Sequence, residues 1–321
     1  MHSDKNSRIL RRCAAVLTLT AAVAVGSSSV AATNDLFDQP LEGGIASNMF
    51  VAHVTKAGMP KGTFDLVLLQ PNPFTSNHYL VPTSWDAGAK TGFVPASPSI
   101  AQLGFRNQVG TSTAQMEGDT VGAYLNSRDL PTTLSNQLMM ISPQYIWQSG
   151  STPVPFASSG SVLNGEMDLQ VPTAVGKKTY VSADLSFLDA NGLRISYSVV
   201  LFHNGMNVGS LPISTNFNAA EHIYILDAPL KAGQQFLSLV NGSASATGTP
   251  WAGFRHFQWT ISQAQFVAAL KYLETKFPGK ITSTDPTQYQ LVQVHLNAEM
   301  NYSPLPAELG WSMRGLKLWV N

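Results

Sequence analysis

Two acidic residues, Glu166 and Asp168, are spaced so that their carboxyls could act together in chemistry. They are two positions apart, and on a β-strand this spacing directs both side chains to one face. Met167 and Leu169 alternate with them and would pack on the other face. Carboxyl pairs serve as nucleophile and as general acid or base. Glu166 and Asp168 are therefore candidate catalytic residues.

A third acidic residue, Glu299, lies near the end of the sequence in a similar pattern. His295, Asn297 and Glu299 are spaced by two, so all three would point to one face of a strand. If Glu299 faces Glu166 across a concave sheet, the two carboxyls could meet the spacing that hydrolysis of a glycosidic bond needs, about 5 Å with retention and somewhat more with inversion. The alternative is that these residues are ordinary polar groups on a solvated face.

The spacing of Glu166 and Asp168 resembles the E-x-D-x-x-E strand of the laminarinase-type glycoside hydrolases, which are concanavalin A-like jelly rolls. The resemblance implies that Glu166 is a nucleophile and that Asp168 assists it. Val171 stands where that family has its acid/base glutamate, so the resemblance supplies no acid/base. The position of Glu299 after a single helix is similar to the layout of the smaller jelly-roll xylanases and endoglucanases, which draw two glutamates from separate strands.

Aromatic side chains could provide platforms on which sugar rings stack. Trp85, Trp147 and Trp251 are the candidates, together with His295 and Asn297 as polar substrate-binding groups. Trp85 and Trp251 lie in sequence rich in glycine and proline, which is typical of exposed loops. The alternative for each tryptophan is a place in the core.

Motifs for metals and phosphates are absent from the sequence. There is no His-x-x-x-His, no cysteine pair, no Gly-x-Ser-x-Gly and no glycine-rich phosphate loop. Asp184 and Asp189 could bind Ca²⁺ through loop oxygens, although they lack the D-x-D-x-D pattern. We expect no cofactor and leave Ca²⁺ at this pair open.

Short apolar runs separated by Gly, Pro, Asn and Ser predict many strands. The expected strands are 63–69, 138–141, 162–171, 179–187, 193–202, 222–226, 235–240, 252–259, 289–300 and 316–320. Asn191-Gly192 predicts a hairpin turn. One helix is expected at 263–276, ended by Pro278-Gly279. We therefore predict a mainly β protein, a jelly-roll or β-sandwich of the concanavalin A-like class, forming one domain over 33–321.

The N-terminal residues have the three parts of a secretory signal peptide. A basic front is followed by the apolar run Cys13–Val25 and by small residues up to Ala32. This run is shorter than the roughly 20 residues that span a membrane. We expect a signal peptide at 1–32, cleavage near Ala32, and a secreted or periplasmic protein. Cys13 is the only cysteine and would be removed with the signal.

The charge balance indicates the class of partner. Formal net charge is zero and charged residues make up only 12% of the chain, so binding to a nucleic-acid backbone lacks its driving force. We expect a polysaccharide or glycan partner and no membrane insertion. The sequence favours a secreted carbohydrate-active protein, with a glycoside hydrolase as one form. A non-catalytic carbohydrate-binding or adhesion domain and a secreted structural or interaction protein are the alternatives.

Overall fold

The structure is a computed structural model of the 321-residue chain. It separates into two units, Met1–Thr33 and Asn34–Asn321, and every described residue belongs to the second. The described residues are 36, 62–71, 78–83, 93–95, 102–107, 113–117, 120–126, 137–147, 150, 152–176, 179–218, 222–230, 234–241, 248–302 and 307–321. The expected signal peptide and Trp85 lie outside them.

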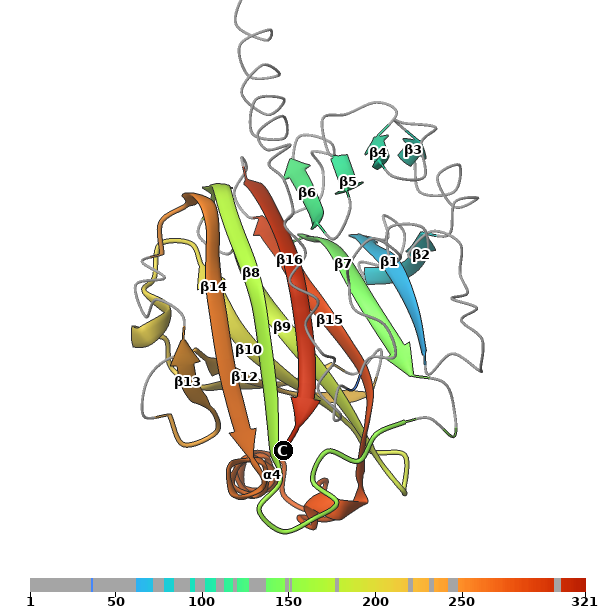
Figure 1. Cartoon of the computed structure of the whole chain (residues 1–321), viewed down its shortest axis with the longest axis vertical. Coiled ribbons are helices and arrows are strands. Elements are labelled where there is room, and N and C mark those ends of the chain that lie inside the picture. The colour runs from blue at the N-terminus through green and yellow to red at the C-terminus, as the bar shows by residue number, and fades with distance from the viewer. Residues whose placement is uncertain are drawn as a thin grey trace, which may run out of the picture. The chain divides into compact units, whose positions relative to one another are not determined.

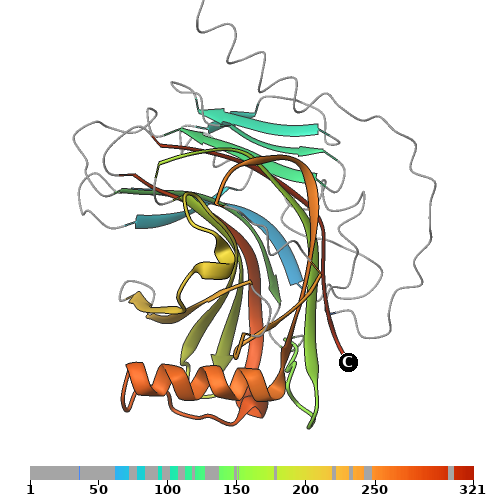
Figure 2. The same cartoon turned by 90° about the vertical axis from the view of Figure 1, so that its left-hand side faces the viewer.

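The described residues form two eight-stranded sheets, which confirms the predicted mainly β sandwich. Sheet A has the order β13 (Ser238–Asn241), β14 (Trp251–Ser262), β8 (Val162–Val175), β16 (Glu308–Val320), β6 (Thr120–Asn126), β5 (Thr113–Glu117), β4 (Gln102–Asn107) and β3 (Phe93–Pro95). Sheet B has the order β11 (Ser214–Asn218), β12 (Ile223–Pro229), β10 (Arg194–His203), β9 (Thr179–Asp189), β15 (Tyr289–Tyr302), β7 (Gln137–Trp147), β1 (Gly62–Pro71) and β2 (His78–Thr83). Strands β8, β14 and β16 lie over β9, β10 and β15 (Figures 1 and 2).

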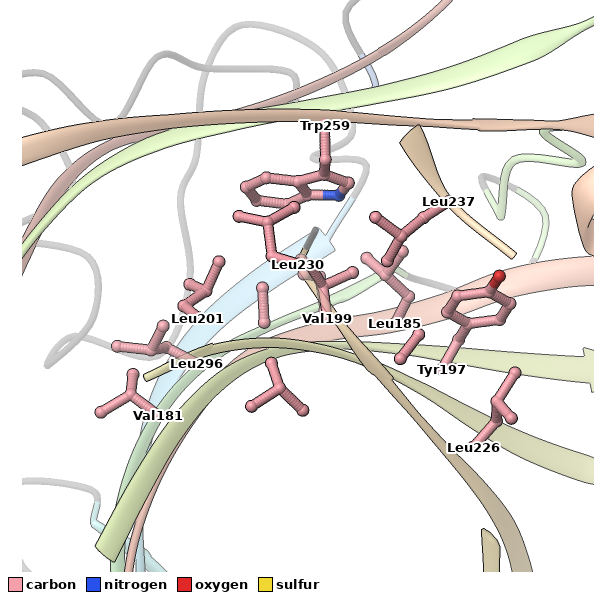
Figure 3. Close-up of a cluster of buried hydrophobic side chains, with 14 of the residues drawn as sticks. Val181, Leu185, Tyr197, Val199, Leu201, Leu226, Leu230, Leu237, Trp259 and Leu296 are labelled. Carbon is pink, nitrogen blue, oxygen red and sulfur yellow. The ribbon is translucent and has the colours of Figure 1, made fainter. Parts of the chain in front are cut away.

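The core fills the space between the two sheets. In β9 the apolar residues Val181, Ala183, Leu185 and Phe187 are each at most 1% exposed, as expected for one face of a period-two strand. Val181 and Leu185 lie with side chains of β10 and β15 below Trp259 of β14 (Figure 3). Burial of these apolar side chains is the main stabilising term of the sandwich.

The predicted helix is present as α4 (Gln263–Lys276). It begins with a capping box, in which the Ser262 side chain accepts from the Gln265 backbone and the Gln265 side chain accepts from the Ser262 backbone. Phe266 on its buried face stacks on Phe156 with ring centroids 4.6 Å apart. Figure 2 shows α4 at one end of the layered strands. No helix in the described part of the chain is long and apolar enough to span a membrane.

The predicted hairpin turn joins β9 to β10 and is closed by Asp189. One carboxylate oxygen of Asp189 accepts hydrogen bonds from the backbone N–H groups of Asn191, at 2.8 Å, and Leu193, at 2.7 Å. The other oxygen accepts from the Thr282 hydroxyl. Gly192 has φ of 84°, a conformation that glycine adopts without strain. These contacts fix the register that places Asp184 opposite Ser198.

Candidate functional site

The structure places Glu166 and Glu299 on different sheets. Glu166 lies on β8 of sheet A, where its neighbour Met167 is 1% exposed in the core. Glu299 lies on β15 of sheet B, where Ala298 is fully buried in the core. Because each strand turns its apolar residues inward, the two glutamates project from opposite outer faces of the sandwich. The expectation that they face each other across one sheet is wrong.

Glu166 and Asp168 are held in an ion-pair network on the outer face of sheet A. Lys317 Nζ lies 2.9 Å from Glu166 Oε1, and Arg314 Nε lies 3.0 Å from Asp168 Oδ2. His256 Nδ1 lies 2.9 Å from Asp168 Oδ1. The basic side chains are 41–51% exposed. Both carboxylates are therefore paired with basic groups at the surface, which is a common structural arrangement worth little stability.

A line of polar residues crosses sheet B on its outer face. The strand register pairs Ser214 with Asp227, Asp227 with Ser198, Ser198 with Asp184, and Asp184 with His295. These five residues come from five adjacent strands, β11, β12, β10, β9 and β15. Residues opposite one another on neighbouring strands project side by side. The line is thus continuous across the sheet.

The outer face of sheet B is its concave side. The strands curve, and the labelled core side chains Val181, Leu185 and Leu296 lie on the convex side, toward Trp259 (Figure 3). Residues that alternate with them must point to the concave side. The concave face of sheet B therefore includes Tyr180, Ser182, Asp184, Ser186, Ser196, Ser198, Asp227, His295, Asn297 and Glu299.

Glu299 is bound to a tyrosine on this face. The Tyr180 hydroxyl donates a hydrogen bond to Glu299 Oε2. Asn297 Nδ2 lies 3.4 Å from the Tyr180 hydroxyl oxygen and 3.4 Å from Glu299 Oε2. Burial raises the pKa of Glu299 to about 7, the hydrogen bonds from Tyr180 and Asn297 oppose the rise, and the charges of Asp184 and Asp227 add to it. Glu299 therefore holds its proton at pH values where an ordinary glutamate is ionised.

Asp184 and Asp227 are the other carboxyls of the concave face. His295 Nε2 lies 3.3 Å from Asp184 Oδ2. Burial raises the pKa of Asp227 to about 6, hydrogen bonds from Ser214 and Ser198 lower it, and the charge of Asp184 raises it. A carboxyl that titrates near neutral pH marks a candidate functional site.

Several buried polar atoms on the same face lack hydrogen-bond partners. Within the described residues these are Ser182 Oγ, Asp184 Oδ1, His295 Nδ1 and Asn297 Oδ1. Ser182 is fully buried and Asn297 is 8% exposed. Buried polar groups are normally hydrogen-bonded, so a concentration of free ones on one face is unusual. These atoms therefore have hydrogen-bonding capacity that no described residue uses.

The structure also corrects the sequence-based aromatic candidates. Trp147 is 5% exposed and its Nε1 donates to the Leu36 carbonyl over 3.1 Å. Trp251 is 6% exposed and packs against Phe202, with ring centroids 5.5 Å apart. Because both rings are enclosed by the core, neither is the exposed sugar platform that the sequence suggested.

The Ca²⁺ pair suggested by the sequence does not form. Asp184 lies on the concave face, whereas both oxygens of Asp189 are engaged in the hairpin turn. An odd spacing of five residues on one strand directs their side chains to opposite faces. The described residues contain no group of three or more His, Cys, Asp or Glu that could hold a metal ion.

Sequence reasoning found His295, Asn297 and Glu299 but missed Tyr180 and Asp227 as their partners. Tyr180 starts the alternation of polar residues along β9, and this periodicity could have identified it. Asp227 lies beyond the expected end of its strand at 226, while β12 continues to Pro229.

Comparison with known proteins gives fold similarity only. No family model matches the chain, and no curated protein matches it. Solved structures that are similar include the xyloglucanase domain of NopAA, a type three effector from Sinorhizobium fredii in complex with cellobiose, at 10% identity over 72% of this chain and 97% of that chain, with a TM-score of 0.38.

Two further similar structures are an endoglucanase and a xylanase from other organisms. Endoglucanase 3 of Trichoderma harzianum, from family GH12, is 9% identical over 84% of this chain and 100% of its own, with a TM-score of 0.33. The family 11 xylanase of Neocallimastix patriciarum is 12% identical over 72% and 96%, with a TM-score of 0.28. These likenesses concern the fold, and the function must be inferred from this chain's own residues.

Proposed function

We propose that this chain is a carbohydrate-active protein whose ligand binds across the concave face of sheet B. The observation that carries the proposal is the unbroken line from Ser214 to His295, with the cluster of Tyr180, Asn297 and Glu299 beside it. Hydroxyl, amide and carboxyl groups hydrogen-bond sugar hydroxyls, which both donate and accept. The unpartnered oxygens of Ser182 and Asn297 on this face support the same ligand chemistry.

The dimensions of the line favour an extended ligand. Five adjacent strands spaced about 4.8 Å apart give a line of about 19 Å. This length exceeds that of a single sugar ring, so the face fits an oligosaccharide segment lying across the strands. A polysaccharide is therefore the ligand class that we propose.

Hydrolysis is the second candidate activity, and the protonation of Glu299 favours it. A carboxyl with a pKa of about 7 can donate a proton to a leaving group near neutral pH. Asp184, held by His295, is the carboxyl that would act as base. Asp184 and Glu299 are four residues apart in register, or about 13 Å along the strands. This separation is longer than the carboxyl spacing of either the inverting mechanism, about 6.5–9.5 Å, or the retaining one, so hydrolysis is the weaker of the two proposals.

The test is a polysaccharide panel in which binding and reducing-sugar release are measured on the same samples. The variants are Glu299→Gln on the concave face and Glu166→Gln on sheet A, a matched change on the opposite face. Binding by the wild type that Glu299→Gln weakens and Glu166→Gln preserves supports the proposed face. Sugar release that is lost only in Glu299→Gln supports hydrolysis.

Other outcomes discriminate among the alternatives. Binding without sugar release from any substrate assigns a non-catalytic carbohydrate-binding domain. If the protein binds none of the polysaccharides in the panel, the proposal is overturned and a structural or interaction protein is favoured.

We also propose that the protein is exported, with cleavage near Ala32. The basic front, the apolar run and the small residues of the N-terminus support this location. N-terminal sequencing of the protein from the medium or periplasm of an expressing cell tests it. A protein that stays in the cytosol with its N-terminus intact contradicts it.

A further inference from the structure

The concave face of sheet B carries acidic groups without lysine or arginine partners. Asp184, Asp227 and Glu299 all lie on it, and among the described residues none of the three pairs with a lysine or arginine. His295 is the basic side chain that contacts them, through Asp184. Arg194 lies on the same face but is four residues from Ser198, about 13 Å along β10.

The opposite face of the sandwich shows how this chain pairs carboxylates elsewhere. On sheet A, Glu166 is paired with Lys317 and Asp168 with Arg314, each at 3.0 Å or less. Those groups are more exposed than Asp184, whose side chain is only 7% exposed. A carboxylate removed from water is costly unless it is paired. The less solvated carboxyls are thus the ones without a lysine or arginine partner.

The free atoms of the face are mostly acceptors. Asn297 Oδ1 is an acceptor only, and so is Asp184 Oδ1 when the aspartate is ionised. Ser182 Oγ can accept a hydrogen bond as well as donate one. Ser182 and Asn297 are both more than nine-tenths buried, and their positions on β9 and β15 direct them to the face that carries the carboxyls. A group that fits such a site brings several donors and no acceptor. An ammonium group has three N–H donors and a positive charge.

We propose that the ligand of this face is a glycan with free, protonated amino groups, such as a polymer of glucosamine. The inference rests on the proposed function, because it assigns the substrate class of the same face. A sugar ammonium placed between Asp184 and Asp227, which lie about 10 Å apart across Ser198, would donate to carboxylates on either side. Its hydroxyls would bind the serine and asparagine side chains.

The test compares three oligosaccharides of equal length by calorimetry in neutral to slightly acidic buffer. They are a glucosamine oligomer, its fully N-acetylated counterpart and a cello-oligosaccharide, which has a hydroxyl in place of the amine. Because a charge-assisted hydrogen bond is worth about 1.5–3 kcal/mol, we expect the glucosamine oligomer to bind about tenfold or more tightly than the other two. Added salt should reduce this preference.

Variants then locate the preference. Asp184→Asn and Asp227→Asn should each reduce the advantage of the glucosamine oligomer over the cello-oligosaccharide about tenfold. Asp285→Asn, the same change at an exposed capping position outside this face, should leave it unchanged. Circular dichroism verifies that each variant is folded. If an aspartate variant does not fold, the salt dependence of the wild-type preference decides in its place.

The two proposals fail in different ways. Equal or tighter binding of the acetylated or neutral oligomer overturns the amino-glycan assignment and leaves the carbohydrate function standing. A preference for the amine that survives both aspartate changes also overturns the assignment. If the protein binds none of the three oligosaccharides and no member of the polysaccharide panel, the proposed function itself is overturned.

Discussion

Tyr180 and Glu299 lie directly opposite each other on neighbouring strands of sheet B, and the tyrosine hydroxyl donates a hydrogen bond to the glutamate. Two opposing effects therefore act on the pKa of the Glu299 carboxyl. Burial favours the protonated form of Glu299, whereas the bond from Tyr180 favours the ionised form. The pKa of about 7 is the balance of the two.

Replacing Tyr180 with phenylalanine removes the hydrogen bond and keeps most of the ring. We expect the pKa of Glu299 to rise above its value of about 7, because burial then acts with less opposition. NMR titration of a ¹³C-labelled glutamate carboxyl measures the change. Tyr272→Phe on α4 is the matched control and should leave the titration in place. A Glu299 pKa that is unchanged or lower in Tyr180→Phe would contradict the assignment.

The raised pKa of Glu299 links stability to pH. Between the ordinary value of 4.5 and about 7 the folded state binds more protons than the unfolded state, so the free energy of unfolding falls as pH rises. The glutamine in Glu299→Gln resembles the protonated acid and does not titrate. Relative to wild type, the variant should therefore gain up to about 3 kcal/mol of stability across this range.

Urea unfolding of wild type and Glu299→Gln at a series of pH values measures this difference. Asp227 contributes a loss in the same direction as pH rises from 3.8 to about 6, and it does so in both proteins. A constant stability difference between the two proteins across the series would show that Glu299 titrates normally.

Gly165 leaves room for the buried ring of Trp259. A Cβ added at Gly165 would lie 2.5 Å from Trp259 Cε2 and Cζ2, and Trp259 is fully buried. We expect Gly165→Ala to lower the free energy of unfolding by about 1–3 kcal/mol through overpacking. Gly310→Ala is the control, since its added Cβ would meet its nearest atom, Thr173 Cβ, at 3.4 Å. Equal stability losses for the two variants in thermal and urea unfolding would refute this account of Gly165.

The ion-pair network around Glu166 should be independent of ligand binding. Glu166→Gln removes its charge pair with the half-exposed Lys317. We expect a stability loss of less than about 1 kcal/mol and unchanged glycan affinity, because exposed pairs contribute little and this face is opposite the candidate site. Urea unfolding and calorimetry measure the two quantities. A large loss of glycan affinity in this variant would show that Glu166 takes part in ligand binding.

Local sequence patterns predicted much of the fold. The apolar run at 179–187 predicted β9, and the Asn191-Gly192 turn predicted its hairpin with β10. Both depend on interactions between residues close in the chain, which a local pattern contains. The same holds for α4 and its stop at Pro278-Gly279.

Contacts between distant segments could not be predicted in this way. Trp251 was expected in an exposed loop because of its glycine and proline neighbours, yet it starts β14 and is enclosed by Phe202 and Phe257. The strand register shifts between Trp251 and Arg255, and Gly253 with φ of 81° lies in that interval. Burial of this ring depends on side chains that other strands supply.

The sequence alone determined that Glu166 and Asp168 share one face, and that His295, Asn297 and Glu299 share another. The two-residue period of a strand fixes such relations within a single segment. Only the tertiary structure decided that these two faces are opposite sides of the sandwich, and that Tyr180 lies beside Glu299. The order of strands and the side that each turns to the core depend on packing between segments more than a hundred residues apart.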